Sequence, residues 1–198
     1  MTLIIAMCAF SLSMSISPGP VNFIGLSSGI KYGFRKSLPF VSGATIGFVI
    51  LLSAIGFGLD VIVAKSSNLF DVLRYFCSGF IGYMAFKIFT ADSHLTTQTQ
   101  KSEIPTFLQG ALLQWLNPKA WMACFAGTAA FNIDDSNKTL VLFICIYFAL
   151  CYAGIACWAL IGNKIGSWLT NPSNMQRFNK TMGGALFIVS VYLVVFNL

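Results

Sequence analysis

Apolar stretches separated by short polar segments make up most of the chain. The first apolar stretch, residues 3–30, contains no charged residue. Five more follow, at about residues 38–59, 69–90, 106–131, 139–163 and 181–198. A helix of about 20 apolar residues crosses a hydrocarbon core roughly 30 Å thick, and each stretch is close to that length or longer. The pattern therefore predicts an all-α membrane protein with six membrane-spanning helices.

The third span is the least regular of the six. It contains Asp71, Arg74 and Lys87 within residues 69–90. Asp71 and Arg74 are three residues apart and can pair on one helix face. Lys87 lies near the far end of the span, where its long side chain can extend to the membrane surface.

The only long polar stretch of the chain, residues 91–105, follows the third span. It is expected to be a mobile linker that divides a single transporter domain into two halves, residues 1–90 and 106–198. His94, the one histidine, lies in this linker. Solvation is a simpler interpretation for an isolated linker histidine than a role in pH sensing.

Two proline motifs interrupt the first and fourth spans. The first contains Pro18 and Pro20, and the second contains Pro118, which lies 98 residues after Pro20 in a chain of 198. Proline cannot donate a backbone hydrogen bond, so the helical carbonyls of Met14 and Ile16 lose their partners. Inside a bilayer, such groups are tolerated where they are buried in protein or line a wet cavity. Interrupted helices at corresponding positions of two halves indicate a transporter's binding site, whereas a prolyl kink with a packing role is the simpler alternative.

The distribution of basic residues predicts how the chain lies in the membrane, because cytoplasmic loops carry an excess of lysine and arginine. The first, third and fifth loops with their helix ends contain eight basic residues: Lys31, Arg35, Lys36, Lys87, Lys101, Lys164, Arg177 and Lys180. The second and fourth contain three: Lys65, Arg74 and Lys138. This bias places both termini outside. With three helices in each half, the halves are then predicted to be inverted repeats whose broken helices run in opposite directions.

Composition narrows the classes of function. Hydrophobic residues make up 57% of the chain and charged residues 9%, whereas a soluble domain has about 25% charged residues. The net charge of +6 comes from basic residues in short loops, which argues against nucleic-acid binding. The six cysteines have neither the spacing of a metal site nor that of a disulfide framework, and no cofactor is expected. No basic residue precedes Lys31, so the first span is expected to be retained rather than cleaved as a signal peptide.

The two breaks carry the candidate site. Each is expected to begin a new half-helix, whose N-terminal N–H groups (residues 21–23 and 119–121) would be free to bind a carboxylate. The carbonyls freed on the other side of each break suit an ammonium group, so a zwitterionic amino acid fits without an intramembrane acid. The predicted substrate-binding residues are Pro18, Gly19, Pro20, Asn22, Gln114, Asn117, Pro118 and Lys119.

Lys119 and four hydroxyl residues each have a second interpretation. Lys119 is the only charge near mid-membrane, and a charge there is costly enough to indicate function. It could instead reach an aqueous vestibule and pack by its stem. Ser27, Ser28, Ser42 and Thr45 could line the same pathway, but hydrogen bonds to their own helices explain them equally well.

A set of paired motifs carries a resemblance to a known family. These motifs are residues 17–22, Gly29, residues 33–35, Gly43 and Gly47 in the first half, and residues 116–120 in the second. At these positions the chain resembles the LysE/RhtB amino-acid exporters, over essentially its whole length. Within that family it is most similar to the cysteine/O-acetylserine exporter group, at Asn22, Ser27, Ser28 and residues 157–160. The resemblance implies a bacterial inner-membrane exporter with six spans, driven by the proton gradient.

The resemblance also bears on the substrate. Basic-amino-acid members of the family carry acidic residues in the second and fourth spans. The equivalent places here fall near Gly47 and Ala123, where the sequence has no Asp or Glu. This departure argues against lysine or arginine as the substrate, and it leaves the proton carrier unidentified.

These features together predict a secondary transporter rather than an enzyme. It is expected to export small neutral amino acids or their derivatives from the cytoplasm by proton antiport, in the class of cysteine, O-acetylserine, serine, threonine and homoserine. A passive small-solute channel and a basic-amino-acid exporter are the alternatives. An intramembrane enzyme is disfavoured, because His94 lies in the linker and mid-span acids are missing. The expected partners are the substrate and the lipid bilayer, with homo-oligomer formation left open.

Overall fold

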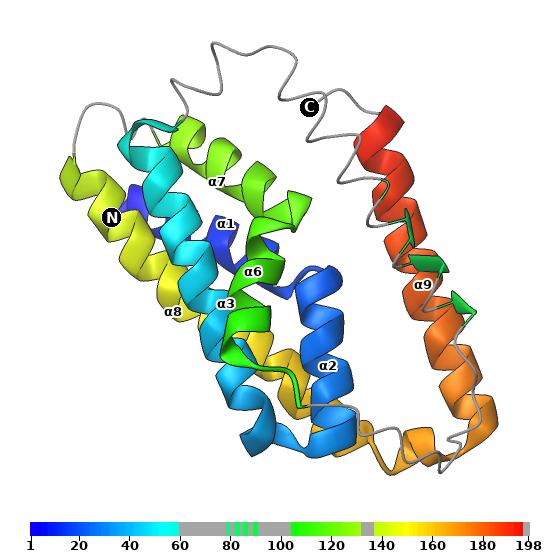
Figure 1. The fold of residues 1–198 in the computed structure, drawn as a ribbon. Helices are drawn as coiled ribbons and strands as arrows, with labels where there is room; N and C mark the ends of the chain where they lie inside the picture. The colour runs from blue at the N-terminus through cyan, green and yellow to red at the C-terminus, as the bar shows by residue number, and fades with distance from the viewer. Residues whose placement is uncertain are drawn as a thin grey trace.

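The computed structural model describes residues 1–59, 104–131 and 137–195, together with residues 79, 82, 83, 85, 86, 89 and 90 (Figure 1). In these residues the regular structure is helical. The elements are α1 (Thr2–Ile16), α2 (Pro20–Tyr32), α3 (Phe34–Ala54) with η1 (Ile55–Leu59), α6 (Phe107–Trp115), α7 (Pro118–Ala130), α8 (Asn137–Ile165), η3 (Trp168–Thr170) and α9 (Pro172–Val195). The prediction of an all-α protein is therefore confirmed for the described part of the chain.

The predicted break in the first span lies between α1 and α2. The axes of the two helices differ by 60°. Gly19 precedes α2 in an extended conformation (φ −170°, ψ 168°), and Pro20 occupies the first helical position. Proline suits this position because its fixed φ is helical and its missing N–H would have no helical partner there.

The predicted break in the fourth span lies between α6 and α7. Thr106 begins α6 with a capping box, in which its side chain accepts from the Gln109 N–H and its own N–H donates to the Gln109 side chain. Helix α6 ends at Trp115, and α7 begins at Pro118. Both proline motifs thus start a new helix, as the sequence predicts.

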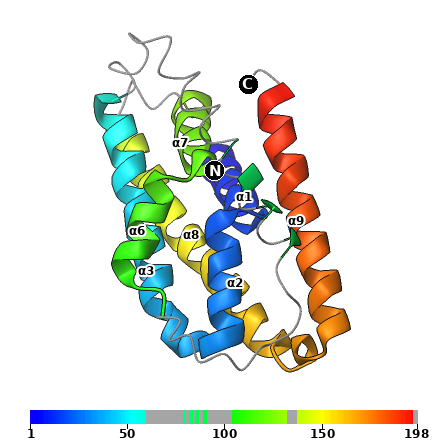
Figure 2. The same cartoon turned by 45° about the vertical axis from the view of Figure 1, so that its right-hand side comes forward.

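The two broken pairs run in opposite directions. In Figure 1 the chain descends through α1 and α2, and it ascends through α6 and α7; Figure 2 agrees with this arrangement. Helix α3 ascends and α8 descends beside them, and α9 ascends farther away in Figure 1.

Two single helices are long and apolar enough to cross a membrane, Phe34–Gly58 with 25 residues and Asn137–Ile165 with 29. The bent pair of α1 and α2 makes a third candidate span. These spans belong to the described residues alone, so the count of six spans stays a prediction. Asp71, Arg74 and Lys87 of the third span and His94 of the linker lie outside these residues.

The boundaries of the fifth loop and last span were predicted wrongly. Helix α9 begins at Pro172 rather than near residue 181, so Arg177 and Lys180 lie on a helix. The Asn171 side chain accepts from the Ser173 N–H at 3.0 Å, which is a helix cap with proline at the first helical position. The first basic loop is also shorter than expected, because only Gly33, with φ +84°, separates α2 from α3.

Glycine pairs bring the helices around the breaks into backbone contact. A Cβ atom added at Gly43 of α3 would lie 1.9 Å from the Phe107 carbonyl oxygen of α6, and one added at Gly110 would lie 2.3 Å from that of Phe40. Helices α2 and α8 approach in the same way. Cβ atoms added at Gly29 of α2 and Gly162 of α8 would lie 2.0 Å from the Ala159 carbonyl oxygen and 2.2 Å from the Leu26 carbonyl oxygen, respectively. The packing interpretation of the small residues in the second span is therefore confirmed.

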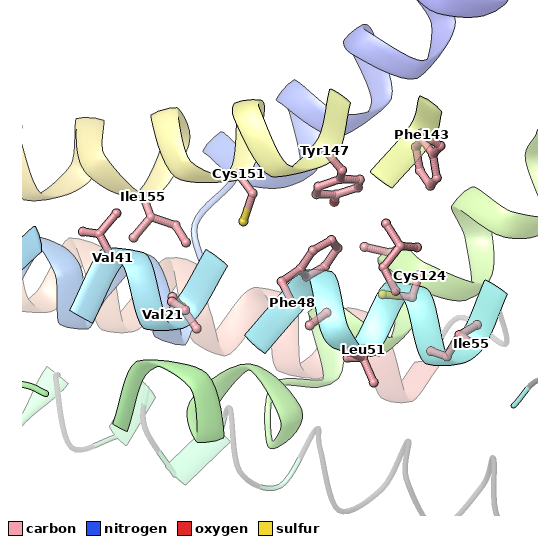
Figure 3. Packing of buried hydrophobic residues seen from close by; sticks show 14 of the residues in the cluster. Val21, Val41, Phe48, Leu51, Ile55, Cys124, Phe143, Tyr147, Cys151 and Ile155 are labelled. Atoms are coloured by element: carbon pink, nitrogen blue, oxygen red, sulfur yellow. The ribbon is translucent and has the colours of Figure 1, made fainter. Parts of the chain in front are cut away.

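The buried core lies where α3, α7 and α8 meet. Its members include Phe48, Leu51, Cys124, Phe143 and Tyr147 (Figure 3). The outward faces of several helices are apolar instead of polar; on α6, for example, Leu108 is 64% exposed. Large exposed apolar faces are rare on monomeric soluble proteins, so this surface suits a lipid environment.

Candidate functional site

The two helix breaks open onto one cavity. It contains about 360 Å³ of empty space, part of which is open to the surroundings. Five of the eight predicted site residues line it: Gly19, Asn22, Gln114, Asn117 and Lys119. The three prolines are not among the lining residues. Pro20 and Pro118 instead begin α2 and α7, so they position the lining residues through the backbone.

Side-chain donors satisfy the carbonyl groups at the end of α1. The Ser17 hydroxyl donates to the Met14 carbonyl at 3.1 Å. The Asn22 amide donates to the carbonyls of Ser15 and Ser17, each at 2.9 Å. The indole N–H of Trp158, from α8, donates to the Ile16 carbonyl at 3.0 Å. The carbonyls of Met14 and Ile16 have thus lost their helical partners, as predicted, but each has gained a side-chain donor.

Lys119 joins the two breaks. Its ammonium group donates to the Ser17 carbonyl, across 102 residues of sequence. Its stem lies against Gly19, because a Cβ atom added at Gly19 would lie 3.2 Å from the Lys119 Cδ atom. A larger residue at position 19 would have to displace this stem. The end of α1 therefore binds an ammonium group, as the freed carbonyls predicted, but that group belongs to the protein.

The N-terminus of α7 is closed, contrary to prediction. The Asn117 side chain accepts from the Lys119 N–H at 3.2 Å. The Asn117 carbonyl accepts from the N–H groups of Ala120 and Trp121, at 3.0 and 3.4 Å. The Asn117 amide nitrogen donates to the Gln114 side chain at 3.0 Å. The expectation of free N–H groups at residues 119–121 was wrong, because it overlooked that Asn117 is itself a helix cap.

The N-terminus of α2 is more open. Gly19 precedes it and has no side chain, so no side chain caps the helix. The Phe23 N–H donates to the Gly19 carbonyl at 3.0 Å, which corrects the expectation that it would be free. The backbone groups of Val21 and Asn22 remain at the positive end of the helix dipole. The two breaks, alike in sequence, thus differ in chemistry.

Nine further lining residues are not among the eight predicted site residues. They are Met14, Ser15, Val21, Phe48, Ala120, Ala123, Tyr147, Cys151 and Ile155. The rings of Phe48 and Tyr147 lie 4.3 Å apart at 31°, and both side chains face the space beside Cys151 (Figure 3). These two residues are 99 positions apart, close to the spacing of Pro20 and Pro118. Comparison of the two halves at that spacing could have found them.

The hydroxyl residues suggested for the pathway do not line this cavity. Thr45 donates to the Val41 carbonyl of its own helix at 2.9 Å, which confirms the simpler interpretation. Ser28 accepts from the Ser37 hydroxyl at 2.8 Å. The Ser15 side chain, by contrast, is buried and lines the cavity.

No metal site is found within the described residues. No group of three metal-ligating side chains lies together there. Five cysteines in this part of the chain are free thiols: Cys8, Cys124, Cys145, Cys151 and Cys157.

Comparison with known proteins decides the family. The family model described as LysE type translocator matches residues 12–196 of the chain. The chain belongs to the LysE type translocator family. The resemblance inferred from the paired motifs is thereby confirmed, and so is the prediction of a transport protein rather than an enzyme.

This LysE type translocator has named relatives. It is 29% identical to the cysteine/O-acetylserine efflux protein of Klebsiella pneumoniae subsp. pneumoniae over 167 residues, which cover 82% of this chain and 83% of the relative. It is 27% identical to the cysteine/O-acetylserine efflux protein of Escherichia coli strain K12 over 200 residues, which cover 98% and 95%. No solved structure is significantly similar to it.

Proposed function

We propose that this translocator exports small neutral amino acids from the cytoplasm across the bacterial inner membrane, in exchange for protons. The observation that carries the proposal is the cavity at the two breaks. It offers hydrogen-bonding groups, helix ends and one lysine, and no carboxylate is among its described lining residues. A zwitterion needs a partner for each of its two charges, and opposite helix ends supply both.

The lining of the cavity and the relatives support the same class of substrate. Met14, Phe48 and Ile155 present apolar surface to this space, which suits a short side chain. The efflux proteins that the chain resembles are named for cysteine and O-acetylserine, and we assign this chain to that class, with serine, threonine and homoserine as further candidates.

The transport cycle requires a defined architecture, which forms part of the proposal. One domain has six spans in two inverted halves, residues 1–90 and 106–198, with the substrate bound between the two breaks. The opposite directions of the two broken pairs support this arrangement (Figures 1 and 2). The exposed apolar faces of the helices meet the lipid.

Orientation in the membrane is a testable part of the proposal. Because eight basic residues lie on one side and three on the other, a phosphatase reporter fused after Leu198 is expected to be active outside the cytoplasm. A reporter inserted near Thr97 is expected to be cytoplasmic. Reporter activity on the same side at both positions would contradict the six-span arrangement.

Counterflow in proteoliposomes tests the function directly. Vesicles preloaded with an unlabelled neutral amino acid are expected to take up the labelled form faster than empty vesicles. The reason is that the binding site of a carrier returns to the other side of the membrane more readily with substrate bound than without it. A passive channel, the alternative left by the sequence, shows no such stimulation. Uptake that is equal in loaded and empty vesicles, or absent for every neutral amino acid tested, would refute the proposal.

A further inference from the structure

Lys119 occupies a place that suits the ammonium group of a substrate. Its Nζ atom donates to the Ser17 carbonyl, just beyond the last residue of α1. The C-terminal end of a helix is partly negative and favours a cation. The only other side chain that donates to this carbonyl in the described residues is the neutral amide of Asn22. The cation position at the end of α1 is therefore filled by the protein itself.

The surroundings of Lys119 contain no countercharge among the described residues. The titratable side chains that face the cavity come from α8, namely Tyr147 and Cys151, and Cys124 of α7 lies in the adjoining core. Hydroxyl and thiol groups are ordinarily neutral. The lining residues from α1, α2, α3 and α6 are not titratable, since they are Met14, Ser15, Val21, Asn22, Phe48 and Gln114. Nothing in this set balances a second positive charge.

A substrate ammonium and the Lys119 ammonium cannot share this place at low cost. Two cations within hydrogen-bonding distance of one carbonyl repel each other, and a nearby like charge favours the neutral form of a titratable group. Lysine can lose its proton, unlike arginine, which stays charged in proteins. The arrival of a substrate cation therefore favours the loss of a proton from Lys119.

We propose that Lys119 is the proton carrier of this transporter, and that its ammonium group and that of the substrate bind alternately at the Ser17 carbonyl. The inference rests on the proposed function. When a zwitterionic amino acid enters from the cytoplasm, one N–H bond of the Lys119 ammonium breaks and the proton passes to cytoplasmic water. After the amino acid leaves on the outer side, the Lys119 amine takes a proton from outer water and returns to Ser17. One proton enters for each amino acid exported.

Isothermal titration calorimetry on the purified protein tests this exchange. L-serine, L-threonine, L-homoserine, O-acetyl-L-serine and L-cysteine are titrated at pH 7 in two buffers of different ionisation enthalpy, which counts the protons released. The wild-type protein is expected to release about one proton per amino acid bound. Because binding releases a proton, its affinity for the amino acid should increase as the pH is raised toward 7.5, by up to about tenfold per pH unit. Binding without proton release, and without pH dependence, would overturn the inference and leave the proposed function intact.

Three variants separate proton transfer from a structural role. Lys119→Met is expected to bind the amino acid without proton release and with an affinity that does not change between pH 6 and pH 7.5. Lys119→Arg is expected to bind at least about tenfold more weakly, also without proton release, because its charge cannot leave. Lys164→Met, which removes an exposed lysine near the end of α8, should match the wild type.

The remaining outcomes are also decisive. Proton release that persists in Lys119→Met would assign the proton to another group. Loss of binding in Lys119→Met, with an unchanged melting temperature, would make Lys119 a direct substrate ligand rather than a carrier. If Lys119→Met does not fold, the proton count of the wild type and the behaviour of Lys119→Arg decide. Absence of binding by the wild type for all five amino acids would overturn the proposed function and this inference with it.

Discussion

Replacement of Asn22 with leucine is expected to reduce transport at least tenfold while the protein still inserts into the membrane. The Asn22 amide holds the first break in place, because it donates to the carbonyls of both Ser15 and Ser17. Leucine is similar in size but has no donor. A buried carbonyl left without a partner costs about 1–3 kcal/mol. The substitution leaves the Ser15 carbonyl in that state, and the Ser17 carbonyl keeps only the Lys119 ammonium as its side-chain donor. Initial rates of counterflow, normalised to the amount of reconstituted protein, measure the effect.

The matched control is Asn163→Leu, which makes the same change at an exposed position near the end of α8. It should transport at the wild-type rate. Near-normal counterflow by Asn22→Leu would show that the amide does not shape the site.

Pro20→Ala is expected to reduce the counterflow rate less than Asn22→Leu does. The hydrogen bonds donated by Asn22, Lys119 and Trp158 hold the break in place without help from the proline ring.

A carboxylate introduced at Ala123 is expected to reverse the charge selectivity of transport. Burial of a second cation beside Lys119 costs several kcal/mol unless a carboxylate compensates it. The wild-type protein should therefore transport arginine at least about a hundredfold more slowly than its best neutral substrate, since about 3 kcal/mol corresponds to that factor. Ala123 is buried and lines the cavity. Ala123→Asp should accelerate arginine and lysine transport and slow neutral amino acids, measured by counterflow with a labelled panel.

Ala123→Asn is the control for this prediction, because it adds similar volume and polarity without a charge. It should leave arginine excluded. Wild-type protein that moves arginine faster than every neutral amino acid would refute the assigned substrate class. Gly47 is a poorer place for the same experiment, since a Cβ atom there would lie 2.6 Å from the Ala111 carbonyl oxygen of α6.

The helix breaks could be predicted from sequence because they depend on local covalent structure. Pro20 and Pro118 cannot donate a backbone hydrogen bond wherever they lie in the fold, and each therefore begins a helix. The start of α9 at Pro172 carried the same kind of local signal in Asn171 and Ser173. It was missed because the polar residues there were interpreted as a loop. Five of the eight predicted site residues line the cavity, since they are neighbours of the breaks in sequence.

The partners of the freed groups could not be predicted, because they come from distant parts of the chain. Trp158 reaches the end of α1 from α8, where its indole N–H donates to the Ile16 carbonyl. Phe48 and Tyr147 meet only because α3 and α8 pack together (Figure 3).

By itself, the sequence determined the helical class, the two breaks and the polar residues beside them, because hydrophobic length and the missing proline N–H act within a few residues. The tertiary structure alone decided which helix end stays open and where Lys119 lies in the cavity. Asn117 closes α7, whereas Gly19 leaves α2 uncapped, and Lys119 fills the carbonyl end of α1. The physical reason is that a hydrogen bond between residues 102 positions apart exists only after the helices have packed.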